Sequence, residues 1–125
     1  MIRWSSAVAE APAARKTPLR SEVAVEDTWD LTPLFESDEA WEAAFQALAA
    51  DYKGIANFRG RVGESATTLR DALEFEKDID QRIEGLNQFV ALRTTEDSSN
   101  SAALAREARF QSVCVQVGEA MSRSR

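Results

Sequence analysis

The chain contains no histidine, a single cysteine, three prolines and five glycines in 125 residues. Because histidine is the commonest general base and a common zinc ligand, its absence excludes Ser-His-Asp and Cys-His catalytic arrangements. Cys114 has no partner for an internal disulfide bond, which is expected of a protein in a reducing compartment such as the cytoplasm. So few prolines and glycines also argue against a turn-dense β fold.

Long apolar runs are missing as well, because no stretch approaches the roughly 18 residues that a membrane-spanning helix requires. The formal net charge is −6, from 15 basic and 21 acidic residues. An acidic surface repels the phosphate groups of nucleic acids and anionic lipids, so we expect neither nucleic acid nor a membrane as a partner. A hydrophobic content of 44% suits one globular domain with a modest core.

The first 20 residues differ from the remainder in composition, because they carry four basic residues against one acid and are rich in alanine. A secretory signal needs about 7–15 consecutive apolar residues, which this segment lacks. We interpret residues 1–20 as a disordered basic leader, with an organellar transit peptide as the alternative. Residues 21–125 then form the folded domain.

A helical pattern begins after Ser37, a residue type that caps helix N-termini. Large apolar side chains then recur at steps of four, three, four and three, as expected for one face of a helix. Because glycine costs about 1 kcal/mol in a helix interior, Gly54 predicts that the helix ends near it or continues only weakly. The apolar positions are Trp41, Phe45, Leu48, Tyr52 and Ile55.

A turn with two glycines, residues 57–63, precedes the longest predicted helix. This helix has Ser65 as its candidate N-cap and extends from about residue 66 to 92, or about 40 Å. Its opposite face is charged, with Asp78 and Arg82 spaced for an i,i+4 ion pair. The apolar positions that define it are Leu69, Leu73, Phe75, Ile79, Ile83, Leu86 and Val90.

A polar loop at residues 94–101 leads to a third predicted helix, residues 102–122. The segment Val113–Val117 is ambiguous, because "VCVQV" alternates and is β-branched like a strand. We predict helix because residues 102–111 are strongly helix-forming and no second strand is available for pairing. The apolar stripe comprises Leu104, Ala108, Gln111 and Val115, and it is widened by Phe110, Val113, Val117 and Met121.

Together these segments predict an all-α fold of three antiparallel helices with a long middle helix. Residues 23–35 would form an extended N-terminal segment packed on the helices. We expect Trp41 to lie in the core, and Trp29 to fold back over the helices or to contact something outside the chain. The candidate packing or interface residues are Trp29, Leu31, Leu34, Phe35, Trp41 and Phe45.

Two further groups suggest chemistry but have a simpler interpretation. Four acids between residues 74 and 80 could form a metal site, yet bundle metal sites of this kind normally add histidines, so a solvated helix face is favoured. Cys114 has valines on both sides and no adjacent cation to lower its pKa, so a packing role is favoured over a reactive thiol. We assign no catalytic, cofactor-binding or metal-binding residue. The four acids are Glu74, Glu76, Asp78 and Asp80.

Three segments resemble the oligoendopeptidase F family, bacterial zinc metallopeptidases that hydrolyse short peptides. Residues 20–45 resemble a family motif, E-x-x-W-D-L-x-x-L-F, followed by a helix that carries a tryptophan. Residues 58–69, "FRGRVGESATTL", resemble the family's glycine turn, and residues 91–102, "ALRTTEDSSNSA", resemble the loop after its long helix. The motif positions are Glu26, Trp29, Asp30, Leu31, Leu34, Phe35 and Trp41.

The resemblance implies that residues 20–121 correspond to the N-terminal helical lobe of a longer enzyme. In that family the catalytic part lies downstream, where a His-Glu-x-x-His helix and a later Glu bind zinc and activate water. The N-terminal lobe would help to enclose the substrate cavity and so limit the length of peptide admitted. Because this chain has no histidine to serve as a zinc ligand, we expect it to be catalytically inert alone and to hold no cofactor.

The sequence closes on "MSRSR", whereas the family pattern continues into an acidic, apolar stretch. We therefore expect a fragment, a truncated reading frame or a short paralogue. Its partner would be the missing catalytic lobe, or a second copy in a homodimer, through an uncovered apolar face. The alternative is a stand-alone helical interaction module that binds a partner helix or peptide in a groove lined by Trp41, Phe45 and Leu48.

Overall fold

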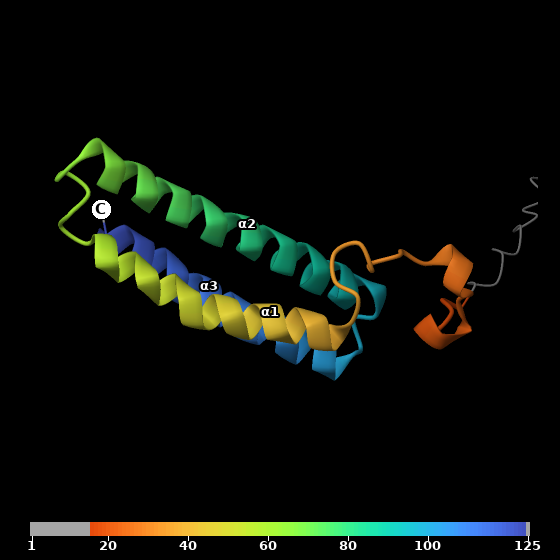
Figure 1. Cartoon of the computed structure of the whole chain (residues 1–125). Coiled ribbons are helices and arrows are strands. Elements are labelled where there is room, and N and C mark those ends of the chain that lie inside the picture. Colours follow the sequence, from red (N-terminus) through yellow and green to blue (C-terminus); the bar gives the residue numbers. More distant parts are fainter. Residues whose placement is uncertain (1–15, 125) are drawn as a thin grey trace, which may run out of the picture.

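The computed structural model describes residues 16–124, and within this range the chain is helical and contains no strand (Figure 1). Three α-helices form an up-down-up bundle in which the middle helix runs antiparallel to the other two. The predicted all-α fold with a long middle helix is therefore confirmed. The α-helices are α1 (Asp38–Asp51), α2 (Ala66–Glu96) and α3 (Ser101–Ser124), and the 3-10 helices are η1 (Arg20–Glu22), η2 (Val25–Asp27) and η3 (Tyr52–Phe58).

Most of the predicted leader, residues 1–20, lies outside the described residues, and its disorder stays a prediction. In the described part of the chain, no helix combines the length and the apolar character needed to cross a membrane.

Side-chain caps fix where the α-helices begin. The Ser37 hydroxyl accepts a hydrogen bond of 3.1 Å from the Ala40 amide, and the Ser65 hydroxyl accepts one of 3.1 Å from the Thr68 amide. Both serine caps were predicted and are confirmed. The third cap was not predicted: the Asn100 side chain accepts hydrogen bonds from the first amides of α3, which satisfies donors that have no partner within the helix.

The end of α2 differs from the prediction, whereas the end of α1 near Gly54 agrees with it. Helix α2 continues to Glu96, so the expected loop at residues 94–101 shrinks to four residues. The hydroxyl of Thr94 donates to the Val90 carbonyl, as threonine hydroxyls do inside helices, so this polar residue does not interrupt the helix. Helix α1 ends at Asp51, but the chain continues as η3 through Gly54, whose missing Cβ leaves room for the ring of Phe75, 3.2 Å from where a Cβ would stand.

Helix α3 buries only part of its predicted apolar stripe. The segment Val113–Val117 is helical, as predicted. Phe110 and Val117 are buried, but Leu104 and Val115 are 44% and 71% exposed, so the latter two positions do not belong to the core face. Because α3 packs against α2 and η3 along one side only, a single narrow stripe is covered and the neighbouring apolar positions remain in solvent.

The core is organised around Trp41, which is completely buried. Its indole N–H donates a hydrogen bond of 3.0 Å to the Leu86 carbonyl of α2. The indole stacks on Phe45 of the same helix, with ring centroids 5.1 Å apart, and meets Phe110 of α3 at 6.3 Å with the rings steeply inclined. One side chain thereby joins all three α-helices.

The N-terminal segment is anchored at fewer points than expected. Leu31 is buried in the core, and the partly buried Phe35 packs edge-on against Phe89 of α2 at 5.5 Å. Trp29 is 75% exposed, so the prediction that it folds back over the helices is wrong, and Leu34 is exposed as well. A local turn, in which the Asp30 carboxylate accepts hydrogen bonds from Thr32, separates the exposed tryptophan from the buried leucine.

A charged clamp ties α1 to α3. The two terminal guanidinium nitrogens of Arg109 donate to the carboxylate of Glu42, at 2.8 and 2.6 Å. The guanidinium also lies 5.5 Å from the ring centroid of Phe45. These hydrogen bonds, with a further one from Gln46, lower the pKa of Glu42 from 4.5 to about 2. The bidentate geometry favours the charged form of the carboxylate.

We expect Trp41→Phe to lower the free energy of unfolding by about 2 kcal/mol, because it loses the hydrogen bond to Leu86 and leaves a cavity. Urea unfolding followed by far-UV circular dichroism measures this. Trp29→Phe is the matched control and should change stability by less than about 0.5 kcal/mol, since its side chain is exposed. Equal losses for the two variants would contradict the central role of Trp41.

We expect Glu42→Gln to lower the free energy of unfolding at neutral pH by less than about 1 kcal/mol, because solvent screens this surface pair. The pKa is depressed in the folded state, so the clamp stabilises the fold above about pH 4.5 and is lost as the pH falls toward 2.

The difference between wild type and Glu42→Gln should therefore shrink over that interval in urea titrations at stepwise lower pH. Glu119→Gln removes an ion pair with Arg123 inside a single helix and serves as the control, with little effect at any pH. A difference that stays constant down to pH 2 would rule out the proposed titration of Glu42.

Candidate functional site

The six residues predicted for packing or interface do not form one site. Trp41, Phe45 and Leu31 belong to the buried core, and Phe35 packs on its rim, whereas Trp29 and Leu34 face solvent. The groove expected along the Trp41, Phe45 and Leu48 stripe is absent, because these side chains are buried against α2 and α3. A partner peptide therefore has no access to that stripe in the folded chain.

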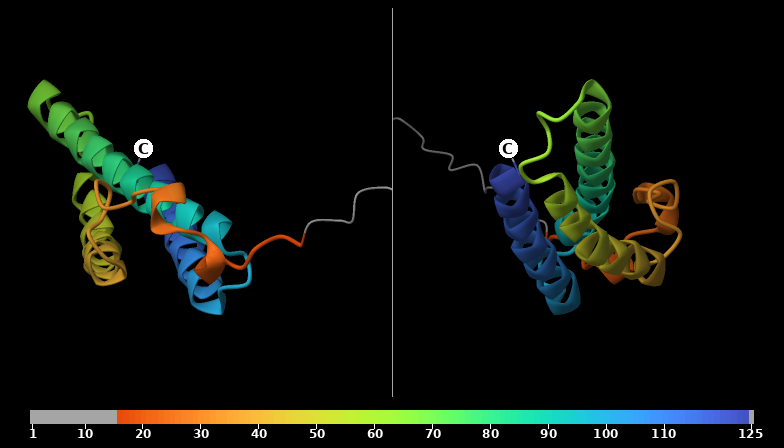
Figure 2. Two further views of the ribbon diagram at one scale, coloured as in Figure 1. Left: turned by 90° about the vertical axis from the view of Figure 1, so that its right-hand side faces the viewer. Right: turned by 60° about the vertical axis from the view of Figure 1, so that its left-hand side comes forward.

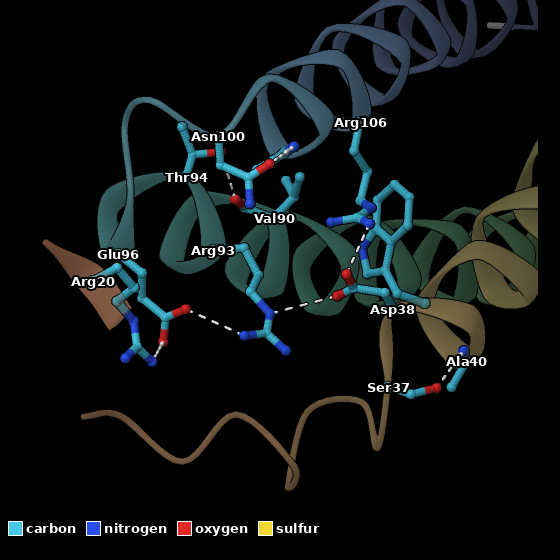
Figure 3. Close-up of polar contacts among 12 residues, drawn as sticks. Arg20, Ser37, Asp38, Ala40, Val90, Arg93, Thr94, Glu96, Asn100 and Arg106 are labelled. Atoms are coloured by element: carbon cyan, nitrogen blue, oxygen red, sulfur yellow. Dashed lines mark hydrogen bonds and ion pairs between the residues drawn. The ribbon is translucent and has the colours of Figure 1, made fainter. Parts of the chain in front are cut away.

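A network of charged side chains, which we call the Asp38 network, lies where α1 begins, α2 ends and α3 begins (Figure 3). Asp38 accepts a hydrogen bond of 2.9 Å from Arg106 and lies 3.5 Å from the Nε atom of Arg93. Arg93 also contacts Glu96 at 3.2 Å, and Glu96 lies 3.7 Å from Arg20 of η1. The network connects four elements that are distant in sequence.

The charged side chains of the Asp38 network pair with one another. Asp38 stands at the N-terminus of α1 and Arg93 in the last turn of α2, where the helix dipoles favour a negative and a positive charge. Three of its buried atoms, the Oδ1 of Asp38, the Nε of Arg93 and the Oε1 of Glu96, lack a hydrogen bond of good geometry. Each nevertheless lies within ion-pair distance of an opposite charge, so the network holds the helix ends together.

Two small cavities, each of about 240 Å³, border the Asp38 network. One is lined by Trp29, Leu31 and Phe35 together with Arg93, and the other lies beside Asn100. The arginines in their walls, Arg20, Arg93 and Arg106, already face carboxylates of the Asp38 network. The network was not foreseen from sequence, since residues 20 and 38 are far from 93 and 106 and no local spacing links them.

The opposite end of the bundle carries an apolar groove of about 320 Å³. Leu69 and Leu73, two of the apolar positions that predicted helix α2, are 44% and 56% exposed there. They are exposed because the N-terminal part of α2 projects away from α1 and α3, as Figure 2 shows. The apolar groove is lined by Ile55, Phe58, Val62, Leu69, Ala72 and Leu73, with Glu76 and Ser124 at its edges.

Within residues 16–124, no three His, Cys, Asp or Glu side chains are placed to hold a metal ion. Of the four acids considered as a metal site, Glu74 lies 3.8 Å from Arg70, and Asp78 lies 3.5 Å from Arg82 as predicted. Cys114 is partly buried, and burial raises the pKa of its thiol, which disfavours the reactive thiolate.

Comparison with curated proteins finds relatives among peptidases. Oligopeptidase PepF of Bacillus subtilis (strain 168) is 36% identical over 94 residues, which are 75% of this chain and 14% of that protein. Group B oligopeptidase PepB of Streptococcus agalactiae serotype III (strain NEM316) is 28% identical over 80 residues, 64% of this chain and 13% of PepB. Oligoendopeptidase F, chromosomal, of Lactococcus lactis subsp. cremoris is 28% identical over 93 residues, 74% of this chain and 14% of that protein.

The chain thus spans about one seventh of the length of the relatives it matches. No family model matches it, and no solved structure matches it significantly. The similarity to PepF nevertheless covers most of the chain, and it agrees with the resemblance seen in the motifs. Over three quarters of its length, this chain is homologous to one short segment of the oligoendopeptidase F peptidases.

Proposed function

We propose that this chain forms the N-terminal helical lobe of an oligoendopeptidase F-like metallopeptidase and helps to enclose the cavity that holds its peptide substrate. The observation that carries the proposal is the 36% identity with oligopeptidase PepF over 75% of this chain. The resemblance of the three motif segments to segments near the start of the family's enzymes supports the N-terminal position. We also propose the cytoplasm as its location, in keeping with a single unpaired cysteine.

The lobe would form part of the wall of the substrate cavity, and the catalytic residues would lie in the rest of the enzyme. The described residues do not fit a zinc site, since they include no suitable ligand group and the whole sequence has no histidine. Zinc binding and hydrolysis of short peptides would therefore belong to the rest of the polypeptide, and this chain alone would be inert. A lobe that forms part of a cavity wall needs a fixed conformation. The core around Trp41 and the Glu42–Arg109 clamp hold the helices of this chain together.

A second candidate function is that of a stand-alone interaction module. Trp29, 75% exposed in the N-terminal segment, favours it, because exposed tryptophans are enriched at interfaces. The coding sequence beyond codon 125 distinguishes the two functions. We expect an in-frame His-Glu-x-x-His segment downstream if the chain is a lobe. A stop codon there, together with capture of a specific partner from the native host, would favour the module.

The lobe function can be tested in a chimera of Bacillus subtilis PepF whose matching segment is replaced by the aligned residues of this chain. We expect the chimera to hydrolyse short peptides at a rate within about tenfold of the rate of PepF, because the homologous segment would form the same part of the substrate-cavity wall. PepF without the segment is the negative control and should lose activity or fail to reject long peptides. The measurement is hydrolysis of a peptide length series.

An inactive chimera, whether folded or unfolded, would show that this chain cannot serve as the lobe. Full activity and unchanged length selection in the deletion control would contradict the proposed role of the segment itself. The isolated chain, assayed at the same concentration, should show no hydrolysis.

A further inference from the structure

The apolar groove is an apolar surface at this end of the bundle that no element of the described chain covers. Leu69 and Leu73 stand one turn apart on α2, and Phe58 and Ile55 of η3 face them across the groove. Leu69 and Leu73 also line a shallower hollow on the outer side of α2, so the apolar surface continues around the helix. Contiguous surface of this kind, as opposed to scattered single residues, usually marks a place of contact with other polypeptide.

Of the residues that line the groove, only Glu76 and Ser124 are polar. In the adjoining hollow, Arg70 lies 3.2 Å from Asp71 and 3.8 Å from Glu74, so its charge is compensated within the helix. What the groove offers is therefore apolar area, and the fitting occupant is a segment with large apolar side chains.

Two observations indicate which polypeptide that is. About six sevenths of the length of the relatives has no counterpart in this chain, so a large body of polypeptide is available to cover the groove. Ser124, at the end of α3, lines the groove itself, so the polypeptide that follows α3 in a full-length enzyme starts beside it. A covalently attached segment reaches the groove at high effective concentration, and even a small groove can then hold it.

A second copy of this chain fits less well. Each copy carries a net charge of −6, so two copies repel each other at low ionic strength. A free partner would also lose translational and rotational freedom on binding. The apolar contacts available in a groove of about 320 Å³ compensate poorly for that loss.

We propose that the apolar groove receives apolar side chains of the segment that follows α3 in an oligoendopeptidase F-like enzyme, and so docks this lobe onto the remainder of the enzyme. The inference rests on the proposed function, because it requires that the enzyme continue beyond α3. It adds the surface through which the lobe is held, with Leu69 and Leu73 as its central contacts.

The test compares two double variants in the PepF chimera and in the isolated chain. Leu69→Asp with Leu73→Asp places charges in the groove. Leu104→Asp with Val115→Asp places the same charges on the exposed face of α3, and Leu104 has the same 44% exposure as Leu69. In the isolated chain neither pair should lower the melting temperature appreciably, because all four side chains are already exposed.

In the chimera the groove pair should reduce activity by about tenfold or more and lower the melting temperature, whereas the α3 pair should leave both near those of the parent chimera. If the charged pair prevents folding of the chimera, Leu69→Ala with Leu73→Ala replaces it, and this pair should lower activity and melting temperature by a smaller amount. Equal effects of the groove pair and the α3 pair would overturn the groove inference while the lobe function stands.

An inactive parent chimera would instead overturn the proposed function, and the inference with it. Sedimentation of the isolated chain completes the test. A dimer that the groove pair converts to monomer would assign the groove to a second copy and would overturn docking of the attached segment. A monomer in both cases is the expected result.

Discussion

The hydrogen bond from the Trp41 indole to the Leu86 carbonyl is the interaction on which the arrangement of the helices depends. An indole buried without a partner for its N–H would be costly, so this one contact fixes the rotation of α1 and its height along α2. Phe110 of α3 then packs against the opposite part of the same aromatic pair. The remaining ties between helices, including the Glu42–Arg109 clamp, act at positions that this contact has already set.

Much of the fold was predictable because its signals are local. Ser37 and Ser65 cap the helices that follow them, and the spacing of Trp41, Phe45 and Leu48 defines a single buried face. The strand-like pattern at residues 113–117 was correctly read as helix, since a lone strand has no partner for its backbone groups.

The candidate sites were much less predictable, because they depend on which faces are left uncovered. Periodicity places Leu73 and Val115 among the apolar positions of their helices, but both are exposed. An apolar side chain is buried only where a second element packs against that face of its helix. Sequence spacing does not show where a neighbouring helix diverges. The same limit applies to Trp29, which was expected to fold back over the helices but is exposed beside a local turn at Asp30. The Asp38 network joins residues from four elements, so only the assembled bundle brings its charges together.

The Asp38 network and the apolar groove lie at opposite ends of α2, and this placement gives the bundle a polarity. At one end, paired charges join the ends of the helices to one another. At the other end, Leu69 and Leu73 remain exposed to solvent. If the chain docks onto a larger enzyme as proposed, this asymmetry would set its orientation, with the apolar end facing the enzyme and the charged end facing away.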